Sequence, residues 1–353
     1  MEISVSRRGL TVCAAAILAA AAVAVLPAGP ARAASWSAVP TPGAVRSVDA
    51  VDAANVWVVG DNGLAARWNG TTWTATPTPL ATAGLQGVDG AAPDDIWAVG
   101  RAGSGTLTEH WDGAAWSVVP SPNPPNATWS LELAAVKTFS AAEAWAVGSY
   151  STSAAPIQRT LIERWNGSAW SIVPSPNPDA EVNLLTDVDG AAPDDIWAVG
   201  NVAHEAYGGT PRGGLVLHWD GSAWTRINVP GTVSDGTINF PTLEDVFVVS
   251  ADDVWIVGRA FSWTVFRTIP IALHWNGQNW QRSLLSTGPD DGVGFRSVAA
   301  LSATQVYAFG RVIARWTGTG WSVDASVSNT LTDATAIGPS TFWAVGGSVA
   351  MRQ

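Results

Sequence analysis

The residues best suited to ligand chemistry lie in or beside three long segments between repeated strands, residues 149–159, 201–214 and 259–270. These segments place aromatic side chains next to charged and imidazole groups, which is the composition of a ligand site. The candidate ligand-binding residues are Trp129, Tyr150, Arg159, His204, Glu205, Tyr207, Arg212, Trp263 and Arg267. Of the 21 Trp, only Trp129 and Trp263 stand outside repeated positions, and His204 is the only histidine outside them. The alternative interpretation is that the aromatic residues only pin long loops to the sheets beneath.

These residues match no catalytic or metal-binding motif. The chain has no Gly-rich phosphate loop, His-Glu-x-x-His pair, serine nucleophile elbow or calcium loop. Three of the four histidines occupy a repeated position that is otherwise arginine, and arginine does not ligate metals. The basic residues at that position are Arg67, His110, Arg164, His218, His274, Arg315 and Arg352. We predict no catalytic residue, metal or cofactor, and we expect each basic group to bond a carboxylate or carbonyl, with Asp49, Asp89 and Asp189 as candidate partners.

The elements that position these segments are short strands repeated along the chain. An aromatic, a small and an apolar residue followed by Gly recur from Trp57, Trp97, Trp145, Trp197, Trp255, Tyr307 and Trp343. A Trp-Asn/Asp-Gly-x-x-Trp stretch recurs at 68–73, 111–116, 165–170, 219–224 and 275–280, with Thr317 replacing the Asn or Asp at 316–321. Asn-Gly and Asp-Gly favour tight hairpins because both residues accept positive φ. Each repeat therefore predicts a four-stranded antiparallel meander.

The two ends of the chain complement each other in this pattern. Residues 36–40 match a fourth strand, whereas the C-terminus stops after a third strand. The sequence therefore predicts an all-β fold: a seven-bladed β-propeller of four-stranded antiparallel blades, closed by N-terminal strand pairing with the C-terminal blade. Residues 34–353 would form this single domain. The repeated Trp are expected to pack between blades, and the alternative is a ring of equivalent sugar pockets.

The repeat resembles a kelch or galactose-oxidase-type propeller blade in its aromatic-apolar-Gly strand, followed by an aromatic, a turn and a Trp. It departs from kelch in having one Gly where that family has two. The turn Asp112-Gly113-x-x-Trp116 also resembles, less closely, the Asp-box hairpin of sialidase-like propellers. The resemblance implies architecture and transfers no activity. The copper-radical chemistry of galactose oxidase needs a Cys-modified Tyr, and Cys13, the single cysteine, lies in the leader.

Residues 1–33 have the parts of an export signal: Arg7-Arg8, an apolar run from Val12 to Leu26, and the small-x-small site Ala31-Arg32-Ala33. We expect bacterial export of a secreted, extracellular protein, by the general or the twin-arginine route. The apolar run is too short to predict a membrane-spanning helix. The net charge of −11 argues against nucleic acid as a partner. We expect a monomer that does not insert into membranes.

Three functions fit these observations. The first is a secreted binding module for a glycan or an extracellular protein, acting through the long-loop face of the third, fourth and fifth blades. The second is a hydrolase or lyase acting on extracellular polysaccharide. The third is a structural, envelope-associated protein with no small ligand.

Overall fold

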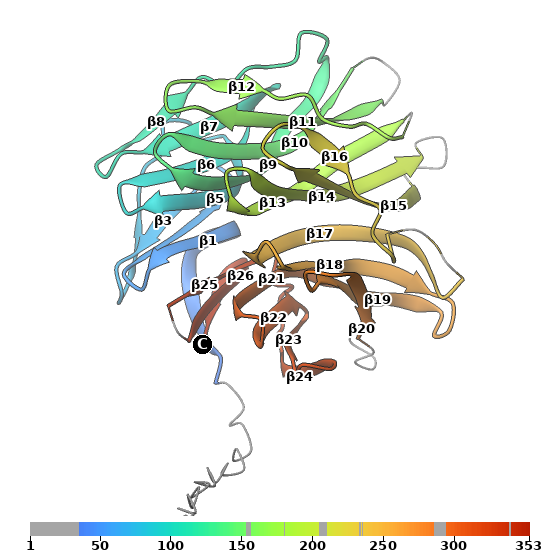
Figure 1. The fold of residues 1–353 in the computed structure, drawn as a ribbon. Coiled ribbons are helices and arrows are strands. Elements are labelled where there is room, and N and C mark those ends of the chain that lie inside the picture. The colour runs from blue at the N-terminus through green and yellow to red at the C-terminus, as the bar shows by residue number, and fades with distance from the viewer. Residues whose placement is uncertain are drawn as a thin grey trace, which may run out of the picture. The chain divides into compact units, whose positions relative to one another are not determined.

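The computed structural model describes residues 35–152, 157–179, 181–204, 210–232, 234, 236–285, 294–338 and 340–353. All of them belong to one compact unit, Ala34–Gln353. Every element in these residues is a strand (Figure 1), and none of the described residues forms a helix long and apolar enough to cross a membrane. The predicted leader and the boundary after residue 33 lie outside the described residues and stay predictions.

The strands follow one another through short connections. Their bounds are β1 (Ser37–Asp52), β2 (Asn55–Gly60), β3 (Ala65–Trp68), β4 (Trp73–Ala75), β5 (Gly84–Ala92), β6 (Asp95–Ala102), β7 (Gly105–Trp111), β8 (Trp116–Val119), β9 (Trp129–Ser140), β10 (Glu143–Ser151), β11 (Gln158–Trp165), β12 (Trp170–Ile172), β13 (Val182–Ala192), β14 (Asp195–His204), β15 (Thr210–Trp219), β16 (Trp224–Arg226), β17 (Ile238–Ser250), β18 (Asp253–Ser262), β19 (Arg267–Trp275), β20 (Trp280–Leu284), β21 (Phe295–Ser302), β22 (Gln305–Gly310), β23 (Val312–Trp316), β24 (Trp321–Ser326), β25 (Asp333–Ile337) and β26 (Thr341–Arg352).

The predicted hairpins are present, and their chemistry is that of the Asx-Gly turn. In the β7–β8 hairpin Trp111 lies opposite Trp116. Gly113 adopts φ 92°, and the Asp112 carboxylate accepts the backbone N–H groups of Ala114 and Ala115, both at 2.9 Å. A side chain that satisfies two turn amides and a glycine that accepts positive φ together fix the hairpin. The sequence-based assignment of these turns is therefore confirmed.

The predicted division into seven separate four-stranded blades is wrong. The hydrogen bonds define five sheets, of which three are four-stranded: β5–β8, β17–β20 and β21–β24. A parallel contact between Gln158 and Val182 joins β9–β12 to β13–β16 in one eight-stranded sheet. The remaining sheet has six strands in the order β25-β26-β1-β2-β3-β4. The repeat predicted four strands correctly in sheets such as β5–β8. It did not predict that residues 341–352 form one strand or that hydrogen bonds join neighbouring units.

The predicted closure between the chain ends is confirmed. The first half of β1 pairs antiparallel with β26, from Ser37 opposite Arg352 to Pro40 opposite Val349. The second half of the same strand pairs with β2, from Val45 opposite Gly60 onwards. One long strand thus serves both ends, so the C-terminal strand β26 is not left as an open edge.

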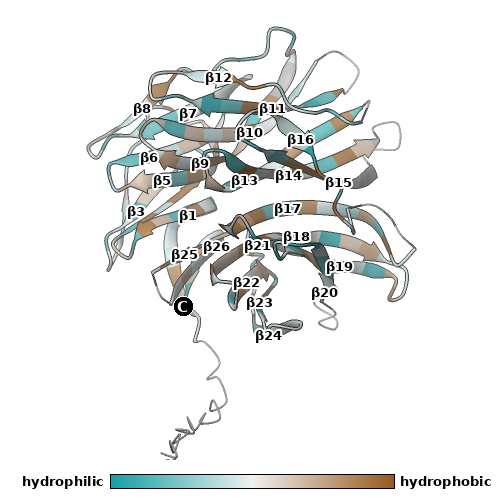
Figure 2. Cartoon of the chain, viewed as in Figure 1, coloured by the Kyte–Doolittle hydropathy of each residue, from teal (hydrophilic) through white to brown (hydrophobic). Residues whose placement is uncertain are grey.

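The core consists of aromatic layers between neighbouring units, and apolar residues run along the strands (Figure 2). Trp57 of β2 is fully buried and packs against Trp111 and Trp116 of the next unit, with ring centroids 5.1 and 5.5 Å apart. The same three-Trp contact recurs around Trp97 and Trp145. Large aromatic side chains dominate core energetics, so these repeated Trp are packing residues, as their structural interpretation predicts.

Candidate functional site

The predicted site residues lie on three hairpins of one face. Trp129 begins β9 opposite Ser151 of β10, and Tyr150 lies opposite Arg159 across β10 and β11. Tyr150 is half-buried and packs on the apolar cluster around Trp97. Arg159 donates to the backbone carbonyls of Gln158 and Asp179 at 3.3 and 3.4 Å, so part of its hydrogen-bonding capacity holds the local loop.

The second and third hairpins carry the remaining candidates. His204 ends β14 opposite Thr210 of β15, and Arg212 follows as a bulged position on β15. Glu205 and Tyr207 lie outside the described residues. Arg267 begins β19 opposite Ser262 of β18. Among the described residues, the candidates therefore belong to strands of separate hairpins.

Trp263 is exposed, whereas Tyr150 is half-buried. Trp263 is 47% exposed, and neighbouring Phe266 is 74% exposed. The Trp263 ring meets Phe261 edge to face at 5.1 Å and Phe266 at 6.2 Å. Phe266 adopts φ 53°, an uncommon conformation for a bulky residue. Trp263 and Phe266 thus form an exposed aromatic pair at a hairpin tip, and the binding role of Trp263 stays a prediction.

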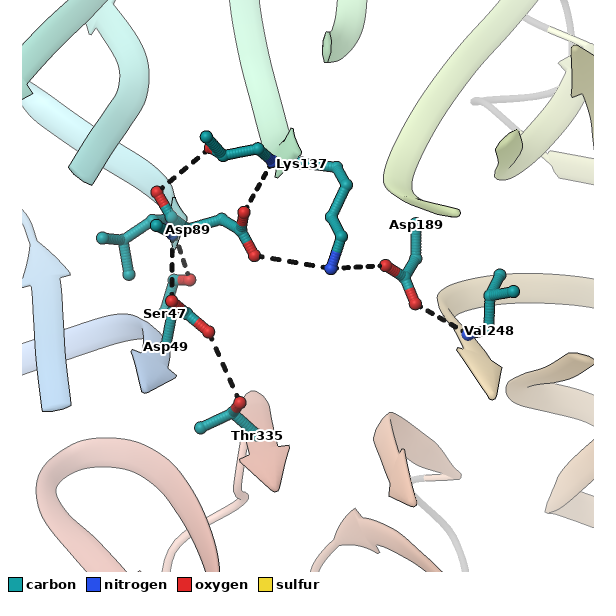
Figure 3. A network of polar contacts seen from close by, with 10 residues as sticks. Ser47, Asp49, Asp89, Lys137, Asp189, Val248 and Thr335 are labelled. Carbon is teal, nitrogen blue, oxygen red and sulfur yellow. Dashed lines mark hydrogen bonds and ion pairs between the residues drawn. The ribbon is translucent and has the colours of Figure 1, made fainter. Parts of the chain in front are cut away.

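A central channel, which the sequence did not indicate, lies between the innermost strands β1, β5, β9, β13, β17, β21 and β25 (Figure 3). Its cavity measures about 190 Å³. Side chains line it in successive rows because each inner strand contributes the same positions. We call Ser47, Asp187, Asp245 and Asp333 the upper row, and Asp49, Asp89, Lys137, Asp189 and Thr335 the lower row.

The carboxylates of both rows connect neighbouring inner strands. In the upper row, Asp245 accepts the backbone N–H of Val298 at 2.7 Å and Asp333 accepts that of Val48 at 2.8 Å. In the lower row, Asp89 accepts the N–H of Thr138 at 2.6 Å. Similar bonds join Asp49 to Gly90, Asp187 to Val246 and Asp189 to Val248. The inner strands leave these N–H groups without a sheet partner, and a buried amide needs one.

Lys137, the single lysine of the chain, bridges two carboxylates of the lower row. Its Nζ lies 2.9 Å from Asp189 and 3.8 Å from Asp89 (Figure 3). Burial opposes the charged ammonium, but the Asp189 and Asp89 carboxylates outweigh it and raise the pKa of Lys137. Burial raises the pKa of Asp49, and the positive charge of Lys137 only partly offsets this effect. The lower row therefore holds a lysine ammonium between acidic strands.

The upper row receives no cation from the described residues. Burial raises the pKa of Asp245 well above its ordinary range, and the neighbouring Asp187 charge adds to the effect. Burial raises the pKa of Asp187 as well, and it raises the pKa of Asp333 to about 6. Neighbouring carboxyl groups also raise each other's pKa, because like charges held close together disfavour ionisation.

Above the upper row the channel widens into a depression that we call the funnel, with a volume of about 690 Å³. Seven residues line both the funnel and the channel: Arg46, Gln86, Ala134, Thr186, Glu244, Arg296 and Thr332. Ser149 and Gln158, which directly precede the predicted residues Tyr150 and Arg159 along the chain, also line the funnel. The long-loop face and the funnel are therefore the same side of the propeller units.

The repeated basic residues have other partners than the first-strand aspartates proposed from sequence. His110 bonds Asp95 at 2.8 Å and packs over Trp97 with ring centroids 4.6 Å apart. His274 bonds Asp253 at 2.8 Å and stacks on Trp255 at 3.9 Å. His218 repeats the arrangement, and Arg164 does so with Glu143. The partner is the acid that begins the second strand, because it lies beside the basic residue on the neighbouring strand.

No group of three or more metal-ligating side chains is found in the part of the chain that the structure describes. The rows escaped the sequence analysis because their members bond across units 41 to 59 residues apart. One signal was available. The stretches Arg46-Ser47-Val48-Asp49, Gln86-Gly87-Val88-Asp89 and Thr186-Asp187-Val188-Asp189 share a polar-x-Val-Asp pattern, in which alternate residues face the same side.

Solved structures with a similar fold are β-propellers. The structure of YCF48 bound to D1 peptide matches with a TM-score of 0.61 and 17% identity, covering 90% of this chain and 96% of that one. YCF48 from Cyanidioschyzon merolae matches with a TM-score of 0.61 and 16% identity, over 90% and 98% of the two chains. The WD40 β-propeller domain of Doa1 gives 0.58 and 13%, over 89% and 93%. No protein-family model and no curated protein matches the chain.

These likenesses confirm the β-propeller fold. At such identities they carry the fold alone. The finer kelch, galactose-oxidase-type and Asp-box resemblances gain no support from them and stay predictions.

Proposed function

We propose that this propeller binds an extended polypeptide segment in the funnel. The observation that carries the proposal is the funnel itself: a depression of about 690 Å³, within the size range of ligand sites. Its lining includes the uncharged polar side chains Gln86, Gln158, Thr186 and Thr332. Amide and hydroxyl groups can pair with both the N–H and the C=O groups of an extended main chain.

The YCF48 likeness supports the same ligand class, because that propeller was solved with a D1 peptide. The charges of the funnel rim are of both signs, with Arg46 and Arg296 beside Glu132 and Glu244. A rim of this kind suits a peptide with mixed side chains better than a polyanion such as nucleic acid.

The test is selection of a phage-displayed library of random 12-residue peptides on the full-length chain, followed by fluorescence polarisation with synthetic peptides. We expect enriched sequences whose affinity falls about two- to tenfold when Gln86→Ala or Gln158→Ala removes one hydrogen-bonding group. Asp112→Asn is the matched control, because it lies in a hairpin turn where other repeats carry Asn. Absence of enriched peptides, or binding that ignores both rim variants, rejects the proposal.

Glycan binding is the second candidate, and the exposed Trp263 platform favours it. The aromatic face of Trp263, with Phe266 beside it, suits the apolar face of a sugar ring. A glycan array with wild type and Trp263→Ala tests this function separately, since the hairpin lies apart from the funnel lining. Binding that the variant loses supports a glycan site, and no binding by wild type rejects it.

Secretion and a monomeric state belong to this proposal. The leader-like residues 1–33 support export. Mass spectrometry of the protein from culture medium would show an N-terminus near Ala34, and light scattering would give the mass of one chain. An intact N-terminus in the cell fraction would contradict export.

A further inference from the structure

The channel continues directly from the funnel. Seven lining residues are common to the two cavities. Each upper-row residue directly follows a funnel-lining residue along its inner strand, for example Asp187 after Thr186. A wide depression of about 690 Å³ above a narrow cavity of about 190 Å³ has the shape of a main chain with one side chain pointing down.

The arginines around the funnel are paired with carboxylates. Arg46 makes two bonds to the Asp61 carboxylate, at 2.8 and 2.9 Å. Arg296 lies 3.0 Å from Glu244, and Arg259 lies 3.5 Å from the same carboxylate. These contacts reduce the positive potential at the rim, and the charged side chains that the upper row presents to the channel are aspartates.

The lower row shows that this channel holds an ammonium group. Lys137 places its Nζ between Asp189 of β13 and Asp89 of β5. Asp187 of the upper row is two residues from Asp189 on the same strand, and such residues face the same side. The upper row thus repeats, one step nearer the funnel, the surroundings of an observed lysine ammonium.

The upper row also has free capacity for a cation. Asp187 and Asp245 each use Oδ2 to accept a backbone N–H, from Val246 at 2.9 Å and from Val298 at 2.7 Å. Burial raises the pKa of both carboxyl groups, so without a cation they favour the protonated form. A cation bound between them would favour the carboxylates, the proton would pass to water, and both strand contacts would remain.

We propose that the segment bound in the funnel inserts one lysine or arginine side chain into the channel, where its cationic group pairs with Asp187 and Asp245. This inference rests on the proposed peptide binding and specifies the partner chemistry: an extended segment with a basic residue at its anchoring position. A cation paired with carboxylates inside a narrow channel is screened less than one on the open surface.

The experiment uses the peptides enriched from the random library on the full-length chain. We expect lysine or arginine at one fixed position of those peptides. Replacing that lysine by norleucine keeps the aliphatic stem and removes the charge, and it should weaken binding about 10- to 100-fold. Asp245→Asn should abolish most of this difference, because the Asn side-chain oxygen still accepts the Val298 N–H while the carboxylate charge is gone. Asp112→Asn again serves as the matched control.

The outcomes separate the two proposals. Peptides that bind with no basic preference, or whose norleucine analogues bind equally well, overturn the inference and leave peptide binding intact. Absence of any enriched peptide overturns both. The norleucine comparison leaves the protein unchanged, so the answer stands even where Asp245→Asn alters folding, which thermal unfolding of the variant reports.

Discussion

Glu109 should make the protein less stable as the pH rises, and its replacement should remove that effect. Its side chain is fully buried, and neither carboxylate oxygen has a hydrogen-bond partner. It shares a face of β7 with Leu107 and Trp111, which belong to the apolar cluster around Trp57. Burial raises the pKa of Glu109 from 4.5 to about 7.

The sign follows from proton binding. Below pH 4.5 the group is protonated in both the folded and the unfolded chain. Between pH 4.5 and 7 only the folded chain holds the proton, so the free energy of unfolding falls by about 1.4 kcal/mol per pH unit. Above pH 7 both states are ionised and the loss is complete, at about 3 kcal/mol. Stability is therefore lost over the window from pH 4.5 to 7.

Glu109→Gln has no charge to bury. We expect the difference in unfolding free energy between pH 5 and pH 8, measured by urea denaturation, to be about 2–3 kcal/mol smaller in the variant than in the wild type. Comparing differences removes the constant cost of burying the new amide. Glu163, whose pKa burial raises to about 8, and the channel aspartates act equally in both proteins.

Asp194→Asn, in an exposed turn, is the control and should keep the wild-type pH profile. The reasoning is refuted if Glu109→Gln and the wild type lose the same free energy between pH 5 and pH 8. That result would mean that burial does not keep Glu109 protonated in the folded chain.

Three further predictions concern the rest of the fold. Trp97→Ala should destabilise the chain by about 3–5 kcal/mol in urea denaturation, because it empties a buried inter-unit contact, whereas Trp263→Ala at an exposed tip should change stability by less than about 0.5 kcal/mol; equal effects would contradict the packing assignment. Lys137→Met should lower the free energy of unfolding by about 1.5–3 kcal/mol at pH 8 and by less at pH 4, where Asp89, whose pKa burial raises to about 8, is protonated; a loss independent of pH would argue against the ion pair. Deleting residues 35–40 should uncover the edge of β26 and cause aggregation in light scattering, and a monodisperse deletion variant would show that β1 does not protect this edge.

The sequence predicted the parts of the fold that are set by local chemistry. Asp112-Gly113 specifies a hairpin because one side chain and one glycine satisfy the turn by themselves. The match between residues 36–40 and a fourth strand predicted the β1–β26 pairing. The C-terminal repeat lacks a fourth strand and the N-terminus has an extra one, so the two are expected to pair. The parallel contact of Gln158 with Val182 was not predictable, because it depends on the relative position of two neighbouring units and not on the sequence within one repeat.

The sequence also predicted only part of the candidate site. Trp263 stood out because its type breaks the repeat, and it is an exposed platform. The sequence did not reveal the channel, because Asp49, Asp89 and Asp189 are equally plausible partners for the repeated basic residues. In four repeats the acid that begins the second strand bonds the basic residue instead. The carboxylates of Asp49, Asp89 and Asp189 reach backbone amides of the next unit, a contact that no spacing within one repeat reveals.

The channel aspartates have two tasks that use different oxygen atoms. Oδ2 of Asp187 and Asp245 holds the next inner strand, so the ring keeps these contacts whether or not the carboxyl groups are protonated. In the lower row, the ammonium group of Lys137 compensates the negative charge of Asp189. The upper row has no such cation among the described residues, and a bound cation would leave its strand contacts in place. Binding of a basic ligand therefore leaves the contacts between inner strands intact. The rigid strands in turn hold the carboxylates in place for binding.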